Sequence, residues 1–71
     1  MSPIAQIATN FQDMPYGVEY ARSELIHKLS EGLTPDMTAE VLAFIVHKRE
    51  SGELVKVMTG QGDRYYRRGT T

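Results

Sequence analysis

The sequence predicts a small α+β domain in which three helices are followed by a C-terminal β-hairpin. Helix-start signals recur near residues 2, 23 and 34, apolar residues follow each of them at helical spacing, and Gly52 separates the last helix from two β-prone stretches. At 71 residues the chain has room for one core, since a chain of this size buries only about 60% of the surface that it exposes when unfolded. We therefore expect a single domain spanning residues 1–71.

The first helix is expected to begin with Ser2 as N-cap and Pro3 at the first helical position, where a missing N–H does no harm. Apolar residues at i, i+3, i+4 and i+7 then form one face of this helix: Ile4, Ile7, Ala8 and Phe11. The helix ends before Pro15, because the residue before a proline is pushed out of the helical region. Residues 18–20 are β-prone and form a candidate strand that pairs with the hairpin.

The second helix is predicted from Ser23, a candidate N-cap, with Glu24 in the first turn, where a negative charge suits the helix dipole. Its apolar stripe consists of Leu25, Ile26 and Leu29. Gly32 is placed to end it in a left-handed C-cap.

The third helix repeats this start signal at residues 34–36, where a threonine cap, a proline and an acid follow one another. Helical spacing continues to about Ser51, and Gly52 ends the helix. The residues at this spacing are Thr38, Val41, Leu42, Ile45 and Val46.

The hairpin is predicted over residues 53–68, with strands at 53–58 and 64–68 and a turn at 59–63. Glycine adopts the positive φ that tight hairpin turns require, which explains Gly60 and Gly62. A phosphate-cradling loop is excluded because a strand follows instead of a helix start. Tyr65 and Tyr66 point to opposite faces of their strand, so we expect one of them in the core.

This order of helix, short strand, helix, turn, helix, strand, wing and strand resembles a winged helix-turn-helix domain over nearly the whole chain. Residues 23–29, the turn around Gly32, residues 38–49 and the wing at 53–68 carry the resemblance. In that family the second helix of the motif usually lies in the DNA major groove and the wing touches the backbone or minor groove. The resemblance therefore implies sequence-specific binding of double-stranded DNA, commonly by a dimeric transcription regulator.

Positive charge is concentrated in the second half of the chain, although the net charge is only −1. Six of the eight basic residues fall between residues 48 and 68, and we expect those of the hairpin to share one outward, phosphate-binding surface. The alternative is a solvated hairpin whose arginines blunt an exposed strand edge. The candidate nucleic-acid-binding residues are Lys48, Arg49, Lys56, Arg64, Arg67 and Arg68, together with His47.

The opposite face of the third helix favours a different partner. At about 100° per residue its apolar stripe is centred between Val41 and Leu42, so Asp36, Glu40 and Phe44 lie on the other side. Two acids are a poor set for a phosphate-lined groove, whereas an exposed aromatic is typical of a protein contact. The second hypothesis is therefore a protein-interaction module, a small inhibitor or adaptor. If the helix phase is off by one position, Phe44 belongs to the core instead.

Other function classes find little support. Without cysteine the chain has no disulfide, thiolate nucleophile or Cys-based zinc site, and His27 and His47 lack metal-ligand spacing. A chain this small struggles to form a substrate pocket, so we expect neither an enzyme nor a cofactor. No apolar run approaches the roughly 20 residues of a membrane span, and we expect no secretory signal. We expect a cytoplasmic prokaryotic or phage protein. Packing alone gives marginal stability at this size, and self-association into a homodimer would add to it.

Overall fold

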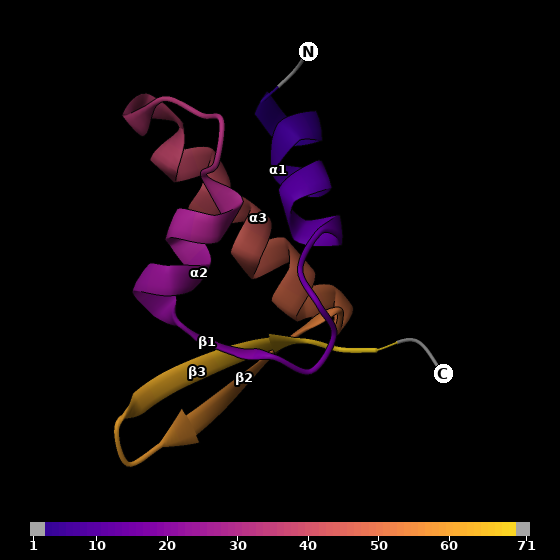
Figure 1. Cartoon of the computed structure of the whole chain (residues 1–71), viewed down its shortest axis with the longest axis vertical. Coiled ribbons are helices and arrows are strands. Elements are labelled where there is room, and N and C mark those ends of the chain that lie inside the picture. Colours follow the sequence, from indigo (N-terminus) through magenta and orange to yellow (C-terminus); the bar gives the residue numbers. More distant parts are fainter. Residues whose placement is uncertain (1–2, 70–71) are drawn as a thin grey trace.

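The computed structural model describes residues 3–69 and places three helices over one face of a three-stranded antiparallel sheet (Figure 1). The α+β class and the expected order of elements are confirmed. In chain order the elements are α1 (Pro3–Gln12), β1 (Glu19–Ala21), α2 (Arg22–Leu29), the 3₁₀ turn η1 (Pro35–Met37), α3 (Thr38–Ser51), β2 (Leu54–Thr59) and β3 (Gly62–Arg67).

The sheet has the strand order β1-β3-β2, so the second arm of the hairpin is its central strand. Tyr65 pairs with Tyr20 on one side and with Lys56 on the other. Thr59 organises the hairpin turn, since its hydroxyl donates to the Gly62 carbonyl at 2.6 Å and accepts from the Gln61 N–H at 3.2 Å. The short strand expected near residues 18–20 is observed as β1, and it pairs with strand β3 of the hairpin.

The core fills the space between the helices and the inner face of the sheet. Tyr65 is the tyrosine that enters it, at 4% exposure, while Tyr66 lies on the opposite face. Ile4 does not enter the core and is 64% exposed. The buried apolar residues are Ile7, Phe11, Met14, Leu25, Leu29, Val41, Ile45, Leu54 and Tyr65.

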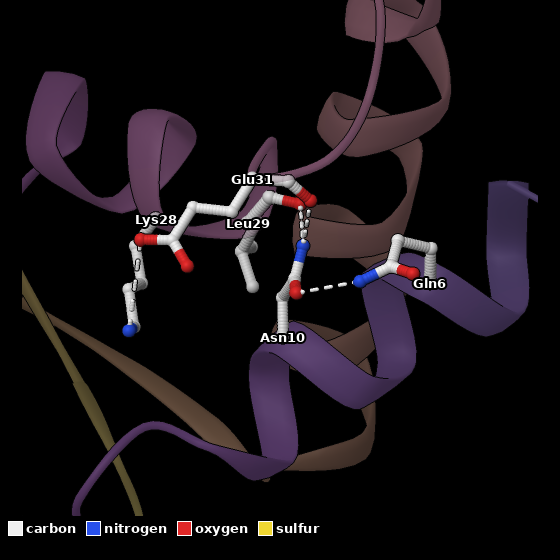
Figure 2. A network of polar contacts seen from close by, with 5 residues as sticks. All are labelled: Gln6, Asn10, Lys28, Leu29 and Glu31. Carbon is white, nitrogen blue, oxygen red and sulfur yellow. Dashed lines mark hydrogen bonds and ion pairs between the residues drawn. The ribbon is translucent and has the colours of Figure 1, made fainter.

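A buried asparagine joins α1 to the end of α2 (Figure 2). The Asn10 side chain donates to the carbonyl oxygens of Leu29 at 2.9 Å and Glu31 at 2.8 Å. Leu29 is the last residue of α2, and the last carbonyls of a helix have no partner within it, so the bond to Leu29 satisfies a group that burial would otherwise leave unpaired. Gln6 completes the network by donating to the Asn10 side-chain oxygen at 3.0 Å. The position of α1 is thereby fixed against α2.

The helix ends differ in part from the expected ones. The proposed Ser2 cap lies outside the described residues. Helix α2 begins at Arg22, so Ser23 lies inside the first turn and is not the N-cap. The chain turns directly out of β1 here, and the Glu24 carboxylate accepts the Ala21 N–H at 3.1 Å, as in one half of a capping box.

The other ends follow the glycine signals more closely. Helix α2 stops at Leu29, and Gly32 adopts its left-handed conformation (φ 79°) only after a further turn. Helix α3 ends where expected, with Gly52 left-handed at φ 83° and its N–H bonded to the Arg49 carbonyl. This end sets the direction in which the chain enters β2.

Candidate functional site

The register of the hairpin divides its cations between the two faces of the sheet. Directly paired residues share a face and successive residues alternate. Lys56 pairs with the buried Tyr65, and Arg67 pairs with the buried Leu54, so both cations lie on the helix-facing side. Arg64 pairs with Val57 on the outer side. The expectation of one outward cationic surface is therefore wrong.

Arg67 is a structural residue rather than an available phosphate ligand. Its Nη1 donates to the carbonyl oxygens of Gln12 at 2.9 Å and Met14 at 3.0 Å. Its guanidinium also lies 4.2 Å from the centre of the Tyr16 ring and 5.1 Å from that of Phe11. A cation is favoured at a helix C-terminus, where unpaired carbonyls and the helix dipole both attract it. Arg67 thus holds the end of α1 against the sheet.

Three further candidate cations form ion pairs within the chain. Lys48 binds Glu53 at 3.0 Å, Lys56 binds Asp63 at 3.3 Å, and Arg64 lies 3.6 Å from Glu24. Hydrogen bonds, first from Lys48 and then from Ser51, lower the pKa of the Glu53 carboxyl below its ordinary value. On the hairpin itself, Lys56 and Arg64 are thus each paired with an acid.

Two of the remaining nucleic-acid candidates, Arg49 and Arg68, lie near the C-terminal end of α3. Arg49 and Arg68 are exposed and make no ion pair within residues 3–69. Arg49 lies near the end of α3, and Arg68 follows β3, where its guanidinium approaches Gly52. His47 is also exposed, but it lies at a groove between α1 and α3.

Phe44 packs against the core, as the alternative helix phase predicts. Val41 and Ile45 are the buried residues of α3, whereas Val46 is 54% exposed. The Phe44 ring is half-buried and meets the Phe11 ring edge to face, with centroids 5.6 Å apart and planes at 70°. Lys48 Nζ lies 5.4 Å from the centre of each ring. The stripe is therefore rotated toward α1, and Phe44 is not a fully exposed anchor.

One edge of Phe44 remains accessible in a groove between α1 and α3. The groove has a volume of about 270 Å³ and a mainly apolar wall. Its floor and rim are formed by Ile4, Ile7, Glu40, Ala43, Phe44 and His47. Of the three residues proposed for a protein contact, Glu40 and Phe44 thus lie together, while Asp36 is not among those that line it. Asp36 instead accepts a hydrogen bond from the Thr34 hydroxyl in η1.

Ile4 and Ala43 were missed as candidate site residues. A signal for the first was present in the sequence, since α1 contains no charged residue although much of it faces solvent. A solvent-facing helix ordinarily carries charged and polar residues on its outer side. The lack of charge on α1 is therefore informative about the groove.

Within residues 3–69, no three side chains of His, Asp or Glu lie together in a way that could hold a metal ion. None of the helices there has the length and apolar content that crossing a membrane requires.

Compared with models of protein families, with curated proteins and with solved structures, the chain has no match.

Proposed function

We propose that this chain is a winged helix-turn-helix domain that acts as a protein-interaction module, with the groove between α1 and α3 as its docking site. The order of elements and the strand order β1-β3-β2 support the winged-helix assignment. The open apolar groove beside the exposed Ile4 is the observation that carries the functional proposal. The role that fits is a small cytoplasmic inhibitor or adaptor of prokaryotic or phage type.

The solvent-facing side of α3 supports a protein partner over DNA. Readers of the major groove use arginine, lysine, asparagine or glutamine to contact base edges. Of the α3 residues that line the groove, the exposed ones are Glu40, Ala43 and His47, and none of them is such a donor; the exposed Arg49 lies outside the groove. A carboxylate there approaches phosphates at an electrostatic cost, and two hairpin cations that would offset it, Lys56 and Arg64, are paired internally. The small side chain of Ala43 permits close approach of another protein.

The chemistry of the groove defines the segment that it accepts. Ile7, Ala43 and Phe44 form an apolar wall that would desolvate one inserted aliphatic or aromatic side chain. Such an anchor in a fully desolvated pocket is typical of the residues that dominate binding energy at interfaces. Glu40 at the rim favours a hydrogen-bond donor or a cation next to that anchor.

A peptide selection tests the docking site. The chain would be immobilised and challenged with a random peptide library, and selected peptides would be titrated while backbone amide chemical shifts are recorded. We expect shifts around Ile4, Ala43 and Phe44, and loss of binding in an Ala43→Arg variant, whose side chain fills the groove. Val46→Arg is the matched control, since Val46 is exposed on the same helix and does not line the groove.

A DNA titration in parallel distinguishes the protein-interaction module from a DNA-binding regulator. Duplexes of mixed sequence would be titrated over a salt series, because phosphate contacts give an affinity that falls steeply with salt. We expect weak binding that depends little on sequence. Tight, salt-sensitive binding that Arg64→Ala reduces and Ala43→Arg leaves unchanged would overturn the proposal in favour of a DNA-binding regulator.

A further inference from the structure

We propose that the occupant of the groove between α1 and α3 is the same face of a second copy of this chain, so that the protein forms a two-fold symmetric homodimer. This inference rests on the proposed function and names its partner. An interface with two-fold symmetry must be self-complementary, because each residue of the patch meets its counterpart under the same rotation. The groove face meets that requirement in shape and in charge.

In shape, the face carries both a projection and a recess. Ile4 projects into solvent at 64% exposure, and it lies at the edge of the recess that Ile7, Ala43 and Phe44 line. A two-fold rotation places the Ile4 of each copy over the recess of the other. Ala43 at the centre is small, so two α3 helices can approach closely there.

In charge, Glu40 and His47 are arranged symmetrically about the middle of the face. They are seven residues apart on α3, which is about two helical turns, so they lie on the same side of the helix. Ala43 and Phe44 lie midway between them. Antiparallel packing of α3 on its counterpart, with the axis near Ala43, therefore places Glu40 opposite the His47 of the second copy, twice per dimer. An imidazole N–H is a good donor to a carboxylate.

Helix α1 adds no charge repulsion to this packing. Pro3–Gln12 contains no charged residue, so bringing two copies of α1 near one another juxtaposes no like charges. A chain of 71 residues without cysteine also gains from a partner, because domains of this size have a marginal core and often rely on association.

The first test is the mass of the full chain by sedimentation equilibrium over a concentration series. We expect the wild type to approach twice the 8.0 kDa chain mass. Ala43→Arg should sediment as a monomer with unchanged circular dichroism, since Ala43 is exposed and arginine is a good helix former. His27→Arg should remain dimeric, since His27 is exposed on α2 and does not line the groove.

The second test uses the charge pair and separates a second copy from any other partner. In His47→Glu, two carboxylates would face each other at both symmetric positions, and we expect association to weaken by about tenfold. In Glu40→Lys, the carboxylate acceptor is lost. Neither variant should dimerise well alone. An equimolar mixture of the two should associate, because the introduced lysine of one variant then faces the introduced glutamate of the other, and the native pair forms at the second position.

Three outcomes would overturn the inference. A wild type that stays monomeric at the highest soluble concentration, while library peptides still bind the groove, makes a foreign protein segment the occupant and leaves the proposed function standing. A dimer that survives Ala43→Arg has its interface on another surface. Failure of the mixed variants to associate, with both folded, removes the proposed pairing of Glu40 with His47.

Discussion

The β2–β3 hairpin and the groove between α1 and α3 are opposite kinds of surface. The hairpin is rich in charge, yet three of its cations are bound within the chain: Lys56 to Asp63, Arg64 to Glu24 and Arg67 to backbone carbonyls. The groove contains few charged groups, and its apolar wall is left open to solvent. From the sequence, the hairpin was the expected binding surface. In the structure, the groove is the surface whose apolar side chains remain open to solvent.

The difference teaches that the number of cations in a segment is a poor guide to the positive potential that it presents. A paired cation must exchange its partner for a phosphate, so each contact is worth less than one made by a free side chain. Exposed pairs are individually weak, at about 0–1 kcal/mol, so such an exchange costs little for Lys56 or Arg64. For Arg67 the cost is larger, since releasing its guanidinium also releases the end of α1.

The largest expected effect comes from removing that guanidinium. Arg67→Met keeps the length and apolar stem of the side chain but removes both hydrogen bonds to α1 and the contacts with the Tyr16 and Phe11 rings. We expect a loss of about 2–3 kcal/mol in the free energy of unfolding, since two carbonyls lose a charged donor and a cation–π contact disappears. Urea denaturation followed by circular dichroism measures it.

Arg68→Met is the control for this change, because Arg68 is the exposed neighbour of Arg67 and makes no ion pair within residues 3–69. It should shift the free energy of unfolding by less than about 0.5 kcal/mol. Equal, small effects of both changes would mean that Arg67 is a solvated side chain, and the contrast between hairpin and groove would then fail.

The inward position of Arg67 shows where sequence reasoning reaches its limit in the sheet. Alternation predicts that Tyr65 and Tyr66 take opposite faces but does not say which one is buried. A shift of one residue sends every side chain of a strand to the other face. Once Tyr65 is known to be buried, Arg67 and Lys56 follow on the same side. The hairpin was thus predictable, whereas the direction of its cations depended on packing with the helices.

The same limit applies to α3, whose C-terminal end was predicted well and whose start and phase were not. Gly52 ends the helix as expected, but the start signal at Thr34 and Pro35 begins the 3₁₀ turn η1, and α3 itself starts at Thr38. Its apolar residues, however, lie on all sides of the helix, so Val46 could not be distinguished from Ile45 by spacing alone. The edge-to-face contact of Phe44 with Phe11 selects the observed rotation. The groove follows from that rotation, so only its α1 side, where the helix carries no charge, had a signal in the sequence.

Two truncations to alanine compare a groove residue that packs against the core, Phe44, with one at the exposed rim, Ile4. Phe44→Ala removes a half-buried ring and its contact with Phe11. We expect the free energy of unfolding to fall by about 1–2 kcal/mol, less than for a fully buried phenylalanine. Urea unfolding should be measured at low protein concentration, where association adds nothing to stability.

Ile4→Ala provides the comparison at the rim of the groove. Ile4 is 64% exposed, so its truncation should change the free energy of unfolding by less than about 0.5 kcal/mol. Its effect should be seen instead in the association measured at high concentration. A loss of stability as large as that of Phe44→Ala would place Ile4 in the monomer core and close the recess.

The smallest expected effect concerns the acid that neutralises Lys48, next to the groove. Hydrogen bonds from Lys48 and Ser51 lower the pKa of Glu53 in the folded chain below the ordinary value of 4.5. The folded state therefore holds the proton less tightly than the unfolded state, and stability falls as the pH drops below 4.5 and through the folded pKa. Glu53→Gln should flatten this part of the stability profile and change little at neutral pH, since the pair is exposed. If the wild type and the Gln variant lose stability equally between about pH 5 and pH 3, Lys48 is not held by Glu53 in solution, and its charge would be free to act at the groove.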